Sequence, residues 1–237
     1  MKVNDLENIA KKYRREMFEK FLETKQGHPG SIFSMMEIAV SLYHGGFIRF
    51  DERKKKFIDK ALISKGHATS TLYPILRDYG IISEKEWKKW GKTKSQLRVF
   101  GNLSIPGIDI TSGSLGHGIG VAAGFHLVQK PQYKTFVILG DGECFEGSIW
   151  EALNIISNFK LHNVVPVIDY NNRTILGDLD KTYSEYNLSK KIEGFGFNNF
   201  IIDGHDFEEI ENAVEQIHKY KGNSVLFMNT IKGKGIK

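Results

Sequence analysis

The amino-acid sequence predicts an α/β fold: a mostly parallel sheet with helices on both faces. Short continuous apolar runs, such as Thr135–Leu139 and Val164–Ile168, are typical of strands that are buried on both faces. Segments with apolar residues at helical spacing lie between such runs, and this alternation implies a parallel sheet covered by helices. The 237 residues contain no repeat, low-complexity segment or linker, so we expect a single domain over residues 1–237.

The N-terminal part is predicted to be mainly helical. Residues 5–26 carry charged residues between apolar residues at helical spacing, which predicts an amphipathic helix. Its apolar positions are Leu6, Ile9, Tyr13, Met17 and Phe21. Ser34 and Glu37 have the spacing of a capping box before the apolar run Ile38–Tyr43, so a second helix is expected there. A third helix is expected over about residues 68–80.

Strands and helices alternate in the second half of the chain. In order, the expected elements are the strand Thr135–Leu139, a helix over about residues 148–159, the strand Val164–Ile168, the strand Phe200–Ile202, a helix over about residues 207–220 and the strand Val225–Asn229. Ser148 and Glu151 have capping-box spacing at the start of the first of these helices. Ligands of such sheets bind beyond the carboxyl ends of the strands, where the glycine-rich polar segments could lie.

Composition narrows the class of protein. With 41% apolar and 12% aromatic residues, the chain can bury a sizeable core and is not expected to be disordered. Its apolar runs are too short to cross a bilayer, and its N-terminus begins with charged residues rather than a signal core. The single Cys144 cannot form an intrachain disulfide, which fits a reducing compartment. We therefore expect a cytoplasmic protein with no membrane partner.

The formal net charge of +5 is a weaker indication. Lysine and arginine gather at Arg53–Lys56 and within residues 85–94, but acidic residues flank both clusters. Solvated helix faces or turns explain these clusters more simply than a nucleic-acid surface, so no nucleic-acid partner is expected. A basic balance also suits phosphorylated substrates.

Two short motifs follow neighbouring predicted strands. Gly140-Asp141-Gly142 follows the strand Thr135–Leu139, and Asn171-Asn172 follows the strand Val164–Ile168, thirty residues after Asp141. Glycines let backbone N–H groups approach a phosphate closely, and a helix start favours negative charge. A magnesium ion between two phosphates prefers oxygen ligands such as a carboxylate and an amide carbonyl. Either motif alone would be read as an ordinary turn, but the pair favours a metal–diphosphate site.

These motifs resemble the thiamine diphosphate motif, and others along the chain resemble transketolase signatures in transketolase order. They are Gly27–Gly30 (GHPG), Ser64–Ala68 (SKGHA), Thr111–Gly118 (TSGSLGHG) and Gly140–Glu151 (GDGECFEGSIWE). The similarity runs from about residue 5 to the C-terminus and corresponds to the first third of a full-length transketolase. The resemblance implies the thiamine-diphosphate-binding fold and the N-terminal subunit of a two-chain transketolase.

The resemblance also implies a role for individual residues around the cofactor. Asp141, Asn171 and the backbone carbonyl of Arg173 would be ligands of Mg²⁺, or of Ca²⁺ or Mn²⁺. Gly142 would offer its backbone N–H to the diphosphate, and His67 would hydrogen-bond a diphosphate oxygen. The cofactor rings would contact the residues that match the family at Gly113, Leu115 and Ile175.

Four further positions complete the expected site. His28 would face the reacting carbon and the sugar hydroxyls, where an imidazole can move protons near neutral pH. Glu146 and Glu151 would belong to a carboxylate network that links cofactor sites across a subunit interface, although Glu151 could instead cap the helix that begins at Ser148. Asn102 stands where full-length transketolases carry a histidine that contacts the donor sugar, and an amide cannot act as a general acid or base.

Two family elements have no counterpart here. Lys232–Gly235 resembles the KGKG segment of the family, but the histidine expected a little downstream of it is missing before Lys237. The glutamate that activates the cofactor lies in the family's pyrimidine-binding domain, and no stretch of this sequence corresponds to that domain. We therefore expect an α2β2 assembly with a chain that carries the pyrimidine-binding and C-terminal domains, and no activity from this chain alone.

The expected reaction is transfer of a two-carbon ketol unit from a ketose, phosphorylated in our interpretation, to an aldose. Three alternatives remain open: the α subunit of a 2-oxoacid decarboxylating enzyme, a relative of the deoxyxylulose-phosphate synthases, and a non-catalytic assembly domain of the same fold. The GHPG and SKGH segments favour transketolase over the first two. A dinucleotide-binding site near Gly116–Gly120 is weakly supported, because the G-x-G-x-x-G order and a preceding strand are both lacking.

Overall fold

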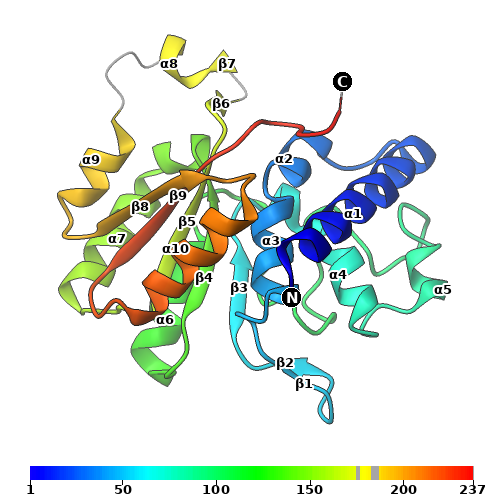
Figure 1. The fold of residues 1–237 in the computed structure, drawn as a ribbon, viewed down its shortest axis with the longest axis horizontal. Coiled ribbons are helices and arrows are strands. Elements are labelled where there is room, and N and C mark those ends of the chain that lie inside the picture. Colours follow the sequence, from blue (N-terminus) through cyan, green and yellow to red (C-terminus); the bar gives the residue numbers. More distant parts are fainter. Residues whose placement is uncertain (175–176, 183–186, 237) are drawn as a thin grey trace.

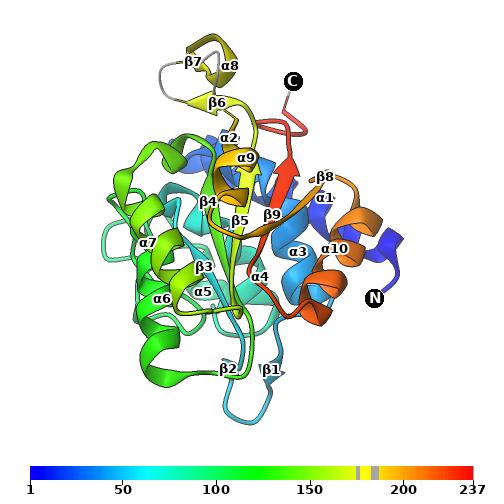
Figure 2. The same cartoon turned by 90° about the vertical axis from the view of Figure 1, so that its left-hand side faces the viewer.

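A five-stranded parallel sheet forms the centre of the molecule, as seen in a computed structural model that describes residues 1–174, 177–182 and 187–236. The strands lie in the order β3-β4-β5-β9-β8. Their bounds are Lys60–Ile63 (β3), Thr135–Gly140 (β4), Val164–Tyr170 (β5), Asn198–Asp203 (β8) and Ser224–Asn229 (β9). The predicted mostly parallel sheet is thus confirmed, and Figure 2 shows it nearly edge-on between two helical layers.

Helices cover both faces of the sheet (Figure 1). One layer is formed by α1 (Val3–Thr24), α2 (Pro29–Ser34), α3 (Met36–His44), α4 (Leu72–Asp78), α5 (Glu84–Trp87) and α10 (Phe207–Lys219). The other is formed by α6 (Gly118–Gln129), α7 (Gly147–Asn158) and α9 (Leu188–Glu193). Short 3₁₀ helices, η1 (Gly66–Thr71) and η2 (Gly142–Phe145), follow β3 and β4.

Strand side chains alternate between two cores, one on each face. Phe136 and Ile138 of β4 belong to the first core, whereas Val137 and Leu139 belong to the second. Both sets are apolar because both faces are covered, which explains the continuous apolar runs in the sequence. The predicted strands at β4, β5, β8 and β9 are confirmed, with ends that differ by one or two residues.

The predicted helices are also confirmed, except that the helix expected from about residue 68 is a 3₁₀ helix up to Thr71 and becomes an α-helix at Leu72. Both capping boxes are wrong. Helix α3 begins at Met36 with Met35 as its N-cap, and Ser34 instead donates its Oγ hydrogen bond to Asp169 at 2.5 Å. Glu37 accepts a hydrogen bond from Arg14 at 2.6 Å rather than from the helix start. In each case a tertiary partner replaces the local one, so spacing alone misassigned the side chains.

Several elements were not predicted. The four-residue β3 begins with a lysine, and α6 contains three glycines that hide its periodicity. Two small hairpins, β1 (Phe50–Asp51) with β2 (Lys56–Phe57) and β6 (Arg173–Thr174) with β7 (Gly177–Asp178), were also missed from the sequence, together with α8 (Leu179–Thr182) and α9. Over the described ranges, no helix has the length and apolar character needed to traverse a bilayer.

Strand register places the two motifs side by side. Gly140 pairs with Asp169, so the segments that follow β4 and β5 emerge next to each other at the carboxyl edge of the sheet. The chain after β9 returns to the same edge, where the backbone N–H of Gly233 donates to the carbonyl of Gly30 at 2.9 Å. This edge is where ligands of parallel α/β sheets bind.

Candidate functional site

Asp141 joins the two motifs directly. It follows β4, is 2% exposed, and its Oδ1 accepts a hydrogen bond from the backbone N–H of Gly142 at 2.7 Å. Its Oδ2 accepts from the backbone N–H of Asn172 at 2.6 Å. Asn172 has a left-handed backbone with φ of 58°, which turns the chain sharply after β5. The carboxylate is therefore held in one orientation by backbone groups from both motifs.

Asn171 presents a buried oxygen without a partner. Its Nδ2 donates to the carbonyl of Asp169 at 3.4 Å, whereas its Oδ1 is buried and accepts no hydrogen bond from the part of the chain that the structure describes. An unsatisfied buried carbonyl costs roughly 1–3 kcal/mol. A divalent cation with a preference for oxygen ligands would satisfy this atom, and the Asp141 carboxylate is hydrogen-bonded to the N–H of the next residue, Asn172. The residues present fit a Mg²⁺-type ion.

The described residues at this edge do not form a metal site built from acidic and histidine side chains alone. In the described ranges, no group of three or more His, Cys, Asp or Glu side chains could hold a metal ion. The arrangement offers one carboxylate, one amide oxygen and nearby backbone carbonyls. Such a set is sufficient only where a ligand supplies further oxygens, as a diphosphate does.

The segment after Asn172 folds over the glycine-rich turn. Arg173 pairs with Asp178 across the β6–β7 hairpin, and their side chains form an ion pair at 2.5 Å. A Cβ added at Gly142 would lie 3.1 Å from Cγ2 of Thr174, so this glycine permits close packing of the two segments. The expected ring contact Ile175 lies outside the described residues.

Burial and a neighbouring acid make the carboxyl group of Asp141 a weaker acid than usual. Burial, the largest cause, and the negative charge of Asp169 outweigh the N–H groups of Gly142 and Asn172 and the charge of Lys65, and the net effect raises the pKa of Asp141 to about 6. A bound divalent cation would favour the ionised form, because an opposite charge within a few ångströms lowers the pKa of a carboxyl group.

The two predicted histidines lie together. The ring centroids of His28 and His67 are 5.2 Å apart, with planes inclined at 67°. Nε2 of His67 lies 3.0 Å from Oγ of Ser31. Burial, together with Lys65 and other nearby cations, lowers the pKa of His67 to about 4. His67 is therefore neutral at pH 7 and can act as a hydrogen-bond donor or acceptor without carrying charge.

The Lys232–Gly235 segment packs against the turn that carries His28. A Cβ added at Gly30 would lie 3.2 Å from Cγ of Lys232. The hydrogen bond from the Gly233 N–H to Gly30 fixes this contact. Two segments about two hundred residues apart in the sequence thus meet at the edge of the site.

Glu143 is a site residue that was not predicted from the sequence. It is 2% exposed, and its Oε1 accepts from Oγ of Ser64 at 2.5 Å and from the N–H of Gly116 at 2.8 Å. Its Oε2 accepts from the N–H of Gly140 at 3.0 Å. One carboxylate therefore connects the SKGHA, SLGHG and GDG loops. The only signal in the sequence was its place after the glycine-rich turn.

A buried ion pair was also missed. Lys65 is 2% exposed and its Nζ contacts the carboxylate of Asp169, which is fully buried at the end of β5. The same Nζ donates to the carbonyl of Ser31 at 3.0 Å, and Thr230 donates to Asp169. Although burial opposes ionisation, Lys65 and the hydroxyl donors hold the pKa of Asp169 below its usual value. The pair fixes α2, η1 and the chain after β9 to the end of β5.

The loop that carries Gly113 and Leu115 lies open beside these segments. Gly113 is exposed, and a Cβ added there would meet nothing within 4 Å, while Leu115 is half-buried. The loop is anchored at Gly66, where an added Cβ would lie 1.5 Å from the carbonyl oxygen of Ser112. The backbone of the two loops is thus in direct contact, and the surface at Gly113 is free for a ligand.

Glu146 and Glu151 are both exposed. The expected capping box at Ser148 is wrong, because α7 begins at Gly147 and Oγ of Ser148 donates to the carbonyl of Gly116 at 3.0 Å. Glu151 therefore makes no cap. Glu146 nevertheless lies close to the SLGHG loop, because a Cβ added at Gly116 would lie 2.7 Å from Cβ of Glu146.

Asn102 uses its side chain within its own loop. Its Oδ1 accepts from the N–H of Ser104 at 3.0 Å, and its Nδ2 donates to the carbonyl of Gln96 at 3.3 Å. The loop approaches η1 at Gly101, where an added Cβ would lie 2.8 Å from Cγ2 of Thr69. These bonds stabilise the turn of its own loop, and within the described residues the Asn102 amide makes no hydrogen bond to His28 or His67.

Comparison with known proteins identifies relatives of this arrangement. Residues 7–237 match a family model described as transketolase, thiamine diphosphate binding domain. One subunit of the apulose-4-phosphate transketolase of Phocaeicola vulgatus is 33% identical over 242 residues, covering 100% of this chain and 86% of the relative. Human transketolase is 32% identical over 243 residues, covering 99% of this chain but 38% of the relative.

A solved structure shows the same fold. The transketolase of Campylobacter jejuni superposes with a TM-score of 0.90 at 27% sequence identity, covering 99% of this chain and 39% of that chain. This chain therefore spans about 39% of the length of that structure. The Phocaeicola vulgatus relative is matched over most of its own length instead.

Proposed function

Because this chain belongs to the transketolase family and carries its thiamine diphosphate binding domain, we propose that it is the N-terminal subunit of a two-chain transketolase. In this proposal it forms a single domain over residues 1–237 and transfers a two-carbon ketol unit from a ketose phosphate to an aldose. The chain has a single cysteine, the buried Cys144, so it cannot form an intrachain disulfide; this supports a reducing compartment, and we propose the cytoplasm.

We propose that the cofactor's diphosphate is held through Mg²⁺ at the carboxyl edge of the sheet. Asp141, Asn171 and the carbonyl of Arg173 would bind the ion, and the N–H of Gly142 would face the phosphates. The observation that carries this proposal is the buried Oδ1 of Asn171, which is unsatisfied within the described chain, together with the Asp141 carboxylate, which the N–H of the next residue, Asn172, holds in place. A cation there would remove the cost of that unpaired oxygen.

Metal-dependent cofactor binding tests the proposal. Calorimetric titration with thiamine diphosphate should show binding with Mg²⁺ and little binding without it. Asp141→Asn should weaken binding by about tenfold or more, because a charged ligand of the ion is lost. Asp203→Asn is the matched control: Asp203 ends β8 at the same edge, is exposed and holds a similar turn through the N–H of His205. Equal affinities of the two variants, or binding that ignores Mg²⁺, would contradict the proposal.

The histidine pair would act on the substrate side of the cofactor. When bound, thiamine diphosphate supplies the carbanion chemistry of ketol transfer. In the proposed roles, neutral His67 hydrogen-bonds a diphosphate oxygen and His28 moves protons at the sugar hydroxyls. Their ring contact supports a shared function, because each ring restricts the orientation of the other. Gly113 and Leu115 would contact the cofactor rings from the open loop.

We propose that a second chain supplies the pyrimidine-binding and C-terminal domains, in an α2β2 assembly. The similarity to a relative that is itself one subunit of a transketolase supports a divided enzyme. The outer faces of α6 and α7 support contact with a second copy, because Val121 is 49% exposed, Val128 77% and Ile155 40%. Glu146 and Glu151 are exposed and available for contacts between subunits.

Two assays separate this function from its rivals. Purified alone with thiamine diphosphate and Mg²⁺, the chain should not catalyse ketol transfer; robust turnover without another polypeptide would refute the divided enzyme. With its partner, ketose phosphates should serve as donors in preference to pyruvate. Preference for pyruvate would instead identify a 2-oxoacid or deoxyxylulose-phosphate-synthase-like enzyme.

A further inference from the structure

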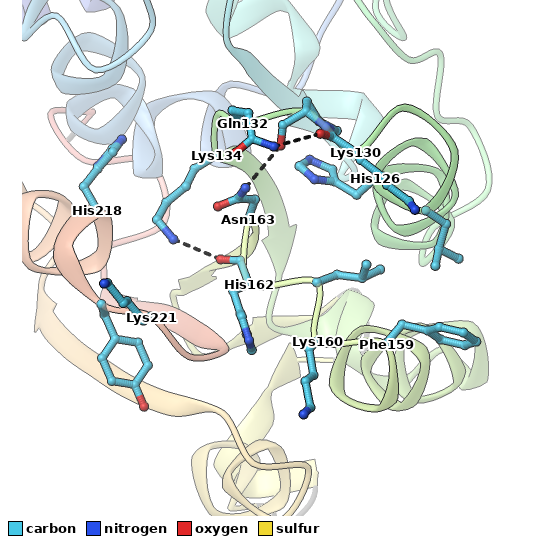
Figure 3. A pocket seen from close by; sticks show the side chains of 14 residues that line it. His126, Lys130, Gln132, Lys134, Phe159, Lys160, His162, Asn163, His218 and Lys221 are labelled. Atoms are coloured by element: carbon cyan, nitrogen blue, oxygen red, sulfur yellow. Dashed lines mark hydrogen bonds between the residues drawn. The ribbon is translucent and has the colours of Figure 1, made fainter.

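A basic cavity lies at the opposite edge of the sheet from the candidate cofactor site. It has a volume of about 730 Å³ and its fourteen lining residues include four lysines and three histidines but no acid. The cationic lining residues are Lys130, Lys134, Lys160 and Lys221 (Figure 3). The cavity opens beside Thr135, where β4 starts, and six strand residues correspond to about 20 Å. It is therefore separate from Asp141, which follows the other end of β4.

Lys134 lies at the inner side of this cavity. Its residue is 8% exposed, and its Nζ donates to the carbonyl of His162 at 2.9 Å, as Figure 3 shows. Within the described ranges, no carboxylate lies within ion-pair distance of this ammonium. An ammonium has three N–H donors, so two remain for another acceptor. Burial lowers the pKa of Lys134, because a buried cation without an anion is costly.

The negative ends of three helices offset only part of the positive charge of the cavity. Helices α6, α7 and α10 end at Gln129, Asn158 and Lys219, beside the lining residues that follow them in the chain. Each helix C-terminus carries about −0.5 elementary charge, so the three together offset about 1.5 positive charges. The four lysines therefore leave a surplus of more than two positive charges, which an anion would neutralise.

We propose that this cavity binds a phosphate-bearing anion, with a phosphate oxygen accepting from Nζ of Lys134 and the outer lysines balancing its second charge. The inference does not rest on the cofactor site, because it uses different residues at the other edge of the sheet. The ligand class is a phosphate or phosphate-ester dianion. A dianion suits the cavity because its charge approximates the surplus left by the lysines and the helix ends.

Phosphate binding can be followed on the histidine rings of the whole chain. Two-dimensional NMR of the imidazole signals should show saturable shifts of His162 and His218 as inorganic phosphate replaces chloride at constant ionic strength. Lys134→Met should reduce phosphate affinity by about tenfold, the effect of losing one charge-assisted hydrogen bond. The double variant Lys130→Gln/Lys160→Gln should weaken binding less, by about threefold, without touching the buried lysine.

Two controls distinguish binding in this cavity from binding elsewhere on the chain. Lys25 follows the end of α1 with a left-handed backbone, as Lys130 follows the end of α6, but it lies outside the cavity. Lys25→Gln should therefore leave phosphate affinity unchanged. Asp141→Asn alters the candidate cofactor site and should also leave it unchanged. The proposal would be overturned if the His162 and His218 signals did not move when phosphate replaced chloride. It would also be overturned if phosphate binding were lost in Asp141→Asn but retained in Lys134→Met and in the double variant. If Lys134 served only to hold His162, Lys134→Met would lower stability and phosphate affinity would stay constant.

Discussion

Replacement of Glu143 tests whether one carboxylate holds the loops of the site together. In Glu143→Gln, the amide oxygen can still accept from Ser64 and Gly116, but the new NH₂ group faces the N–H of Gly140. One charge-assisted hydrogen bond is lost and two donors oppose each other. A hydrogen bond to a charged group contributes about 1.5–3 kcal/mol, so we expect a loss of about 2 kcal/mol in the free energy of unfolding.

Glu143→Ala should be more severe. It leaves the buried N–H of Gly116 and the half-buried N–H of Gly140 without acceptors, at about 1–3 kcal/mol each, while the hydroxyl of Ser64 can rotate to another partner. The expected cost is about 4 kcal/mol. Burial raises the pKa of Glu143, so removing the buried charge recovers part of the desolvation cost and both values are upper bounds.

Urea unfolding, followed by far-ultraviolet circular dichroism, measures these free energies. Glu146→Gln is the matched control, because Glu146 lies three residues away and is exposed. A change within about 0.5 kcal/mol is expected there. If Glu143→Gln were as stable as Glu146→Gln, the three hydrogen bonds would contribute little and the reasoning would be refuted. Weaker binding of thiamine diphosphate by Glu143→Gln would extend the effect from stability to the site.

Four other substitutions probe the buried ion pair, a buried histidine and two glycines. Lys65→Met should cost about 3–5 kcal/mol in urea unfolding, because the carboxylate of Asp169 remains buried without its cation; a loss below 1 kcal/mol would contradict this. Burial lowers the pKa of His126 to about 4, so the unfolded chain binds more protons between about pH 6.5 and 4 and stability should fall as the pH falls through that range. The pKa of His67 is also lowered to about 4, so His126→Gln should remove only part of this decline; an unchanged profile would exclude His126 as a source. Gly66→Ala should destabilise the chain strongly, since an added Cβ would lie 1.5 Å from a backbone oxygen. Gly120→Ala, on α6 with nothing within 4 Å, should instead stabilise it by about 0.5–1 kcal/mol, and equal effects would contradict the packing.

The parallel strands were predictable because burial on both faces leaves a continuous apolar run. Val164–Ile168 illustrates this, because all five residues are apolar and all are buried. Helix α6 was not predictable from periodicity, because its apolar residues surround the whole helix and its glycines have low helix propensity. The side chains of Ser34 and Glu37 were assigned wrongly, because their partners are distant in the sequence and local spacing contains no information about them.

Some residues of the candidate site could likewise be predicted from the sequence, and others could not. Asp141 and Asn171 were found because each directly follows a strand or nearly so, and neighbouring parallel strands end at one edge. The importance of Glu143 could not be inferred, because its partners Ser64 and Gly116 lie 79 and 27 residues away. Lys65 and Asp169, 104 residues apart, pose the same difficulty. Their roles depend on contacts that only the folded chain defines.

The bond from the Asn172 N–H to Asp141 has a consequence for how the protein would load its cofactor. Both oxygens of the carboxylate are already engaged by the backbone, so the two turns are rigid before any ligand arrives. The entropy of ordering them is lost during folding rather than during binding. We therefore expect the binding site to be formed before the cofactor arrives, so that the protein can release and rebind the cofactor without local unfolding.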